Sequence, residues 1–248
     1  MIKKPLISII TVVYNGEKNL EETILSVINQ TYDNVEFIII DGSSTDGTID
    51  IIKKYEDKID YWVSEKDSGI YDAMNKGILA SKGDYINFMN AGDFFTRINL
   101  VSDVVNILNS EEINLLYGNH YTGNGNHYND NIKYKIQFIY KTICHQVIFA
   151  HKICFNNNMF DIKYQWLGDY KWLLECFLNK NIKKKHINKE ICYFEPTNNC
   201  QTSDMHLKRV SERASIGHEY FFNFEKVLFD INQLRLFIKF KYFWKNIT

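Results

Sequence analysis

The first 95 residues alternate between apolar-rich runs and segments of helical periodicity. Apolar-rich runs occur four times, at 6–14, 34–41, 60–65 and 84–90, and the first, LISIITVVY, is continuous. Continuity, as opposed to alternation, is typical of strands that are covered on both faces of a parallel sheet. Between these runs, apolar residues recur three and four positions apart, which predicts helices at 17–30, 45–57 and 69–81. Strands and helices in regular alternation predict right-handed βαβ crossovers and an open parallel sheet.

The pattern after residue 95 is less regular and predicts a second part with antiparallel strands. Helices are expected at 96–112 and 167–180, with two more from about residue 203 onward. INLLYG (113–118) is a predicted strand, and the alternation in IKYKIQFIY (132–140) predicts an antiparallel one. NIKKKHI and ICYFE, within 181–195, are expected to form paired short strands. The chain is therefore predicted to be an α/β protein, either one large domain or a domain with an appendage.

Composition narrows the class of partner. Charged residues make up 24% of the 248 residues and the net charge is −1, so no nucleic-acid partner is expected. The five cysteines form no CxxC pair, which argues against a thiolate zinc site or a dithiol redox motif. Their odd number, without a secretory signal, favours a reducing cytosol. No window approaches the roughly 20 apolar residues of a membrane span, so we expect a soluble or peripherally attached protein.

Polar and small residues follow each of the four predicted parallel strands. They read Tyr14-Asn15-Gly16, Asp41-Gly42-Ser43-Ser44, Ser64-Glu65-Lys66-Asp67 and Asn90-Ala91-Gly92-Asp93. In an open parallel sheet, ligands bind beyond the carboxyl ends of the strands. Any one of these segments is equally explained as an ordinary turn. Four together, two of them with an aspartate directly after an apolar run, favour a binding site.

Two common nucleotide-binding motifs are missing. No GxGxxG follows the first strand and no GxxxxGK[ST] occurs in the sequence, which disfavours a dinucleotide dehydrogenase and a P-loop ATPase. A nucleotide held by side-chain carboxylates and a metal ion is what remains.

Three segments, at 7–48, 65–78 and 83–93, together resemble the family 2 glycosyltransferases of the GT-A fold. They read ISIITVVYNGEKNLEETILSVINQTYDNVEFIIIDGSSTDGT, EKDSGIYDAMNKGI and GDYINFMNAGD. The resemblance is greatest to bacterial members that build capsule, O-antigen and exopolysaccharide; it is strong over about 5–95 and patchy from there to about 200. It implies a Rossmann-like, open, mostly parallel sheet flanked by helices, with a smaller antiparallel acceptor-side element and C-terminal helices.

The resemblance also implies a division of the chain. Residues 1–200 would form the GT-A domain, with a nucleotide-binding half at 1–95 and an acceptor-binding half at 96–200. Residues 201–248 would be a C-terminal helical extension.

Matching the family's motifs position by position assigns residues to the nucleotide-sugar donor. These are Val13, Tyr14, Asn15, Asp41, Asp67, Asn75, Lys76, Asn90, Ala91 and Gly92. Tyr14 and Asn15 would pack against the nucleoside, and Asp41 would accept a hydrogen bond from the base. Lys76 would offset diphosphate charge, although a solvated lysine on a helix face explains it equally well.

Asp93 matches the family's metal ligand, which implies Mg²⁺ or Mn²⁺ as cofactor. A departing nucleoside diphosphate accumulates negative charge, and an oxygen-bound cation stabilises it. Asn90 departs from the acidic form of this motif, which puts the affinity for metal in doubt. The alternative for Asp93 is a cap on the helix expected near Thr96.

Asp169, in WLGDYKWLLEC, matches the family's catalytic base, which takes the proton of the acceptor hydroxyl. A helix N-terminus would hold this carboxylate ionised, but a plain capping role is the alternative. His145, Gln146 and Trp166 are assigned to the acceptor side. A structural histidine and a core tryptophan are the alternatives.

The segment 235–248 combines four cationic side chains with aromatic and aliphatic ones. Such a segment suits the surface of an anionic membrane, where it would place the protein on the inner face of the cell membrane near a polyprenyl-linked acceptor. Packing on the domain itself, or on a second copy in a homodimer, is the alternative.

The function implied is an inverting glycosyltransferase that uses a nucleotide-diphosphate donor, and the donor expected is a UDP-sugar. The acceptor would be a saccharide or lipid-linked saccharide of capsule, O-antigen or exopolysaccharide. Two alternatives remain, a catalytically impaired sugar-nucleotide-binding relative and a sugar-1-phosphate nucleotidyltransferase. The second would need a glycine-rich basic loop after the first strand, where the acidic YNGEKNLEE (14–22) stands.

Overall fold

The computed structural model describes residues 4–123, 125–139, 141–156, 158–194, 203–221 and 232. Within them, nine strands form one sheet in the order β3-β2-β1-β4-β8-β6-β9-β5, with β7 paired to β6. The first four strands are β1 (Ile7–Val13), β2 (Val35–Asp41), β3 (Tyr61–Ser64) and β4 (Tyr85–Phe88). All pairings among these four are parallel, which confirms the arrangement expected from their continuous hydrophobicity.

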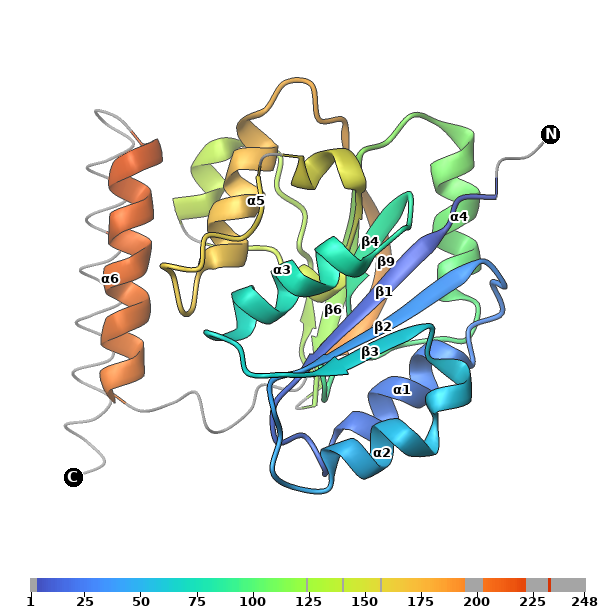
Figure 1. Cartoon of the computed structure of the whole chain (residues 1–248). Coiled ribbons are helices and arrows are strands. Elements are labelled where there is room, and N and C mark those ends of the chain that lie inside the picture. Colours follow the sequence, from blue (N-terminus) through green and yellow to red (C-terminus); the bar gives the residue numbers. More distant parts are fainter. Residues whose placement is uncertain are drawn as a thin grey trace.

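Three helices connect these strands and cover both faces of the sheet. They are α1 (Leu20–Ile28), α2 (Thr48–Lys54) and α3 (Ile70–Ala80), and a 3₁₀ turn at Glu56–Lys58 follows α2. The chain runs outward from β1 to β3 and then returns to β4 on the other side of β1. Right-handed crossovers therefore place α1 and α2 on one face and α3 on the opposite face, as Figure 1 shows. The reversal makes β1 and β4 the topological switch point, where ligands of open sheets bind.

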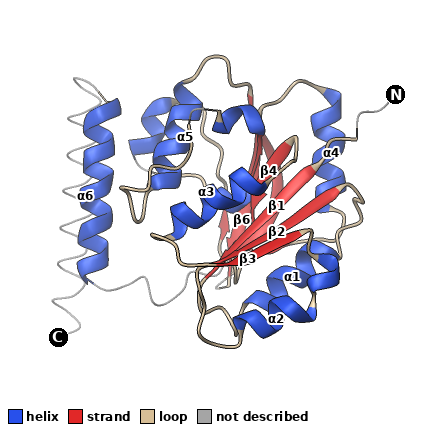
Figure 2. Cartoon of the chain, in the orientation of Figure 1, coloured by secondary structure: helices blue, strands red, loops and turns tan. Residues whose placement is uncertain are grey.

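The second half of the chain extends the same sheet with mixed pairing (Figure 2). Its strands are β5 (Phe94–Phe95), β6 (Leu115–Thr122), β7 (His127–Tyr128), β8 (Ile148–His151) and β9 (Lys184–Phe194). Its helices are α4 (Leu100–Ser110), α5 (Gly168–Leu178) and α6 (Ser203–Tyr220). Because β8 is antiparallel to both β4 and β6, it joins the parallel half to the mixed half.

The strand predicted at 132–140 is wrong, because the structure has a 3₁₀ helix, η2, at Lys135–Ile139. Gln137 Oε1 accepts hydrogen bonds from the backbone N–H groups of Lys133 and Tyr134, which closes a local turn. Phe138 and Ile139 are both fully buried. A strand would send these neighbours to opposite faces.

The paired short strands predicted within 181–195 are also wrong. This segment is one strand, β9, which pairs in parallel with β6 and antiparallel with β5. The polar residues in the middle of this segment suggest a turn. The structure has instead shifts of register in the pairing with β6, between Tyr117 and His120 of that strand. A bulge accommodates extra residues without ending the strand.

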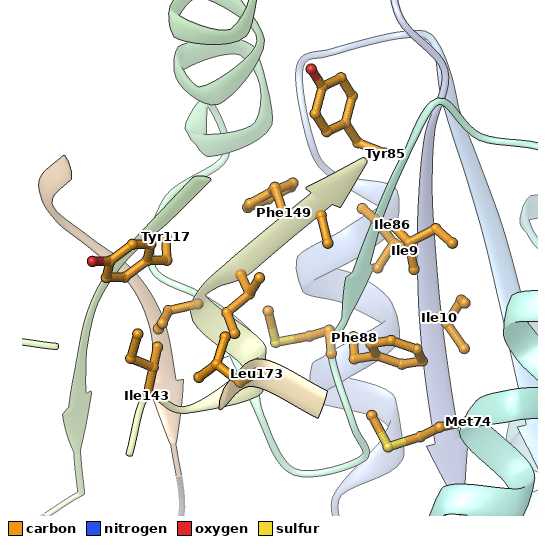
Figure 3. Packing of buried hydrophobic residues seen from close by; sticks show 14 of the residues in the cluster. Ile9, Ile10, Met74, Tyr85, Ile86, Phe88, Tyr117, Ile143, Phe149 and Leu173 are labelled. Carbon is orange, nitrogen blue, oxygen red and sulfur yellow. The ribbon is translucent and has the colours of Figure 1, made fainter. Parts of the chain in front are cut away.

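The core is continuous from the parallel half into α5. Figure 3 shows Ile10, Phe88 and Met74 gathered where α3 packs on the sheet, with Phe149 of β8 and Leu173 of α5 further along. All five are buried, and each apolar side chain of this size contributes roughly 1.5–3 kcal/mol on burial.

The C-terminal region is described only in part. One of the two helices predicted from residue 203 onward is α6, while the second, and the segment 235–248, lie outside the described residues. In the portion of the chain that the structure describes, no helix has the length and apolar character needed to cross a membrane.

Candidate active site

One cavity of about 830 Å³ brings together residues from both halves of the chain. Its lining includes Asn90, Ala91 and Asp93 after β4, Ser68 to Asp72 at the start of α3, His120 of β6, Cys144 to Gln146, Tyr164 to Trp166, Asp169 of α5 and Arg209 of α6. We call it the central cavity. It contains Asp93, Asp169 and the three predicted acceptor-side residues.

The carboxyl ends of β1 and β4 touch each other beside this cavity. The Ala91 N–H lies 3.3 Å from the Val12 carbonyl oxygen. Next to this junction, Asn15 and Ser43 have φ angles of 49° and 68°. Non-glycine residues held in this region are uncommon and cluster at ligand-binding sites. The backbone thus supports the prediction of a binding site at these strand ends.

Asp41 is fully buried at the end of β2. Its carboxylate accepts hydrogen bonds from the Ser44 N–H at 2.9 Å, from the Ser44 hydroxyl, and from the Ser64 hydroxyl at 2.6 Å. It therefore joins the ends of β2 and β3. A contact with the base of a nucleotide, as predicted for Asp41, would add to this structural role.

Tyr14 and Asp67 both lie beside Gly42 at the same rim. A Cβ added to Gly42 would stand 2.6 Å from Asp67 Oδ2 and 3.5 Å from Tyr14 Cβ. Tyr14 is 65% exposed, so its ring is available to a ligand. Asn15 Oδ1 accepts from the Thr45 N–H at 2.9 Å. The structure thus gathers most of the predicted nucleoside residues, although they lie outside the lining of the central cavity.

Asn75 and Lys76 have protein partners instead. The Asn75 side chain donates to the Phe160 carbonyl oxygen at 2.8 Å and accepts from the Phe160 N–H at 3.0 Å. Lys76 Nζ lies 2.8 Å from Glu65 Oε1, and this hydrogen bond raises the pKa of Lys76. Neither residue lines the central cavity. Their contact with a donor stays a prediction.

The segment from Asn90 to Asp93 forms a tight turn directly after β4. The Asp93 N–H donates to the Asn90 carbonyl oxygen at 3.0 Å, and Gly92 has a φ of 99°, which glycine adopts without strain. The Thr23 hydroxyl of α1 accepts from the Gly92 N–H and donates to the Asp93 carbonyl oxygen. The next helix, α4, begins only at Leu100. The helix-cap alternative for Asp93 is therefore wrong.

Asp93 offers an oxygen ligand of the kind that Mg²⁺ and Mn²⁺ prefer. Its side chain lines the central cavity, and Oδ2 accepts from Gln146 Nε2 at 2.5 Å. Asn90 Oδ1, in the same wall, is buried without a hydrogen-bond partner among the described residues. In that part of the chain, no three His, Cys, Asp or Glu side chains gather in a metal-binding cluster. One carboxylate with an adjacent unpaired oxygen fits a cation that takes its other ligands from water and a diphosphate.

Asp169 lies in the first turn of α5 and has three hydrogen-bond donors. Oδ1 accepts from the Tyr71 hydroxyl at 2.8 Å and from the Tyr170 N–H at 2.8 Å, while Oδ2 accepts from His145 Nδ1 at 2.9 Å. Burial alone would raise the pKa of Asp169, but the bonds from His145, Tyr71 and Tyr170 hold this pKa below its ordinary value. The N-cap of α5 is Leu167, so Asp169 is not the cap.

Tyr71 is a site residue that the sequence analysis missed. It lies in α3, and its buried hydroxyl donates to Asp169, so that burial and the nearby carboxylate raise the pKa of Tyr71 well above its ordinary value. A Cβ added to Gly168 would stand 2.8–3.0 Å from carbon atoms of the Tyr71 ring. The glycine before Asp169 therefore allows the close approach of the tyrosine.

Helix α6 supports the wall of the cavity through Glu212, which was also missed. Its carboxylate accepts from the backbone N–H groups of Gln165, Trp166 and Leu167 at 2.7, 3.0 and 3.0 Å. These groups directly precede α5, so Glu212 holds the segment that leads into α5 from another helix. Trp166 lines the central cavity, and its buried Nε1 has no hydrogen-bond partner among the described residues. Trp166 is therefore placed to contact a ligand in the central cavity.

Several sequence relatives of this chain are known. An uncharacterised glycosyltransferase of Mycobacterium tuberculosis is 37% identical over 112 residues, which cover 45% of this chain and 43% of that protein. TuaG of Bacillus subtilis, named for teichuronic acid biosynthesis, is 42% identical over 94 residues, which cover 36% and 37%. The matches therefore span less than half the length of these relatives.

Solved structures match nearly the whole chain. TarS 1-349 of S. aureus in complex with UDP-GlcNAc aligns with a TM-score of 0.69 and 16% identity, over 95% of this chain and 71% of that one. The mannosyltransferase PcManGT of Pyrobaculum calidifontis, in complex with GDP-Man and Mn²⁺, aligns with a TM-score of 0.66 and 13% identity, over 96% and 74%. At such low identity these likenesses show the fold, which is GT-A.

The family follows from a match over most of the sequence. The model named Glycosyl transferase family 2 matches residues 8–177, which include the strand ends, the Asn90–Asp93 turn and Asp169. The chain belongs to glycosyltransferase family 2.

Proposed function

We propose that this protein transfers a sugar, with inversion, from a nucleotide-diphosphate donor to a hydroxyl of a saccharide acceptor. The observation that carries the proposal is that Asp93 and Asp169 line one cavity at the switch point of the sheet. Asp93 can hold a cation beside the leaving diphosphate. Asp169 can take the proton of the attacking hydroxyl. The two halves of an inverting transfer are thereby assigned to two separate residues.

The donor would lie across the carboxyl ends of β1, β2 and β4. Tyr14, Asn15 and Asp67 surround the rim on the nucleoside side, and Asn90 and Asp93 stand on the diphosphate side. The complexes of TarS with UDP-GlcNAc and of PcManGT with GDP-Man support a nucleotide sugar as the donor. A UDP-sugar is the donor we expect for this chain.

Asp93 would hold Mg²⁺ or Mn²⁺, which when bound neutralises charge on the departing diphosphate. The Mn²⁺ in the PcManGT complex supports this cofactor. Gln146 would keep Asp93 Oδ2 in place through its amide, and the unpaired Asn90 Oδ1 would accept from a donor hydroxyl or from a water on the cation.

Asp169 would act as the general base. An ionised carboxylate has about four acceptor positions, and three are filled here, two on Oδ1 and one on Oδ2. Oδ2 therefore retains a position for the acceptor hydroxyl. The oxygen of the acceptor hydroxyl forms a bond to the anomeric carbon while the bond to the diphosphate breaks, and the proton of the hydroxyl passes to Asp169 Oδ2.

The acceptor would enter from the side of Trp166, His120 and Arg209. The similarity to TuaG, named for teichuronic acid biosynthesis, supports a role in polysaccharide synthesis. The acceptor we expect is a saccharide or a polyprenyl-linked saccharide. Membership of family 2 argues against the nucleotidyltransferase alternative. The presence of both carboxylates in one cavity favours an active enzyme over an impaired relative.

The experiment is a donor screen by thermal shift, followed by transfer assays on two variants. A donor present at about 100 times its Kd stabilises the fold by about 2.7 kcal/mol, so the correct nucleotide sugar with Mn²⁺ raises the Tm. We expect Asp169→Asn to reduce transfer by roughly 10²–10⁴-fold and to leave the donor shift intact. Asp93→Ala should weaken both the shift and the transfer. The reverse pattern would show that the two roles are exchanged, and donor binding by the native protein without transfer to any acceptor would favour the impaired relative.

A further inference from the structure

Two consecutive residues contact the two carboxylates of the site. His145 and Gln146 begin a short 3₁₀ helix, η3, at His145–Val147. His145 Nδ1 lies 2.9 Å from Asp169 Oδ2, and Gln146 Nε2 donates to Asp93 Oδ2 at 2.5 Å. Two neighbouring side chains of one turn therefore contact both the acceptor-side and the donor-side carboxylate.

This turn is itself fixed to the sheet. Asn87 of β4 is fully buried, and its amide donates to the carbonyl oxygens of Gln146 and Ile148, both at 2.9 Å. Ile148 begins β8, which pairs with β4. The backbone of η3 is thus held by the strand that leads into the Asn90–Asp93 turn.

The hydrogen bonds around His145 select one form of its ring. Ionised Asp169 can only accept, so Nδ1 must carry the proton in this contact. In a neutral imidazole Nε2 then accepts. Asn90 Nδ2 stands 2.9 Å from Nε2 and supplies the donor. The other orientation of the amide would set its oxygen against the Nε2 lone pair.

An aspartate at position 90 could not make this contact with a neutral ring that carries its proton on Nδ1. Its carboxylate would face the Nε2 lone pair, and the clash would be relieved only by a second proton on the imidazole. The amide where the family motif is usually acidic therefore has a physical reason. The Asn90 amide donates to the form of the His145 ring that Asp169 requires.

We propose that His145 is a positioning residue for Asp169, held by Asn90 in its Nδ1–H form. Asn90 thereby acts on the acceptor half of the reaction as well as on the donor half. The consequence for catalysis rests on the proposed function of Asp169, whereas the form of the ring does not.

The ring form is tested by long-range ¹H–¹⁵N correlation NMR on the whole protein at neutral pH. The signals of His145 are identified by their loss in His145→Asn. We expect a protonated Nδ1 and an unprotonated Nε2 in the native chain, and protonation of both nitrogens in Asn90→Asp. A native ring protonated on Nε2, alone or together with Nδ1, would overturn the proposal, and so would a ring unchanged in Asn90→Asp. This readout requires neither donor nor acceptor.

The positioning role is tested by two matched variants. His145→Asn places an amide near Nδ1 and keeps a donor for Asp169, whereas His145→Gln extends towards Nε2 and removes that donor. We expect kcat of His145→Gln to fall about 10²-fold, with at least a roughly tenfold recovery in His145→Asn and an unchanged donor KM in both. Equal losses in the two variants at equal Tm would contradict the role. Absence of transfer by the native protein, with the expected NMR result, would overturn the proposed function alone.

Discussion

The acidity of Asp169 is set by a balance at the scale of single residues. Burial disfavours its charge, while His145, Tyr71 and the Tyr170 N–H favour it, and the balance leaves the pKa below the ordinary value of 3.8. The ionised carboxylate therefore stabilises the fold above that ordinary value, and the stabilisation is lost as the pH falls through the lowered pKa. A base of this kind is fully ionised at neutral pH, so Asp169 itself imposes no loss of transfer there.

Tyr71→Phe removes one of these donors and should shift the pH profile. A hydrogen bond to a charged group is worth about 1.5–3 kcal/mol, so the acid limb of kcat/KM should move up by roughly one pH unit. Tyr117→Phe is the control, because it removes a buried tyrosine hydroxyl that donates to Ile132 instead. An acid limb that stays in place in Tyr71→Phe would show that this donor does not tune the base.

At the scale of elements, the segment that leads into α5 is held by α6. Glu212→Gln keeps the shape of the side chain but removes the charge that three backbone N–H groups share. We expect a loss of about 1–3 kcal/mol in the free energy of unfolding, and faster hydrogen exchange at residues 165–167. Glu219→Gln, exposed on the same helix, is the control and should change neither. Exchange at 165–167 that is equally fast in both variants would show that Glu212 does not hold this segment.

The elements of the first 95 residues could be predicted because they carry their own signal. A strand covered on both faces is apolar throughout, and a helix on a sheet shows a single apolar stripe. The segment 132–140 misled because Phe138 and Ile139 are buried together in a turn closed by Gln137. The local pattern could not show that β9 continues through its polar middle, since its partners are β5 and β6.

In the site, too, residues in sequence motifs could be predicted, whereas residues placed by distant contacts could not. Asp93 and Asp169 are found in one cavity, as the family motifs imply, and His145, Gln146 and Trp166 join them there. Tyr71 could not be assigned, because its partner Asp169 lies 98 positions away. Glu212 bonds residues 45 to 47 positions away and stands in a helix without a recognisable motif. Contacts made only in three dimensions leave no mark in a short stretch of sequence.

At the scale of the whole molecule, the segment 235–248 predicts attachment to anionic membranes. Each Lys or Arg near such a surface contributes about 1 kcal/mol, so four of them give salt-sensitive binding. We expect cosedimentation with anionic liposomes, lost on deletion of 235–248 and lost at high salt. Neutral liposomes serve as the control. Unchanged cosedimentation of the shortened chain would leave packing on the domain, or on a second copy, as the use of this segment.

The pairing of β5 sets an order of events during synthesis. β5 starts one residue after Asp93, yet it pairs with the end of β9, where Phe94 stacks on Tyr193 at 4.4 Å. The ribosome adds roughly 5–20 residues each second, so the pairing partner emerges on the order of 5–20 s after Asp93. Nascent chains stalled before β9 should therefore contain the first four strands. In these chains the strand that follows the Asn90–Asp93 turn, β5, has not yet paired with β9. Catalytic competence would then arrive late in translation, when β9 pairs with β5.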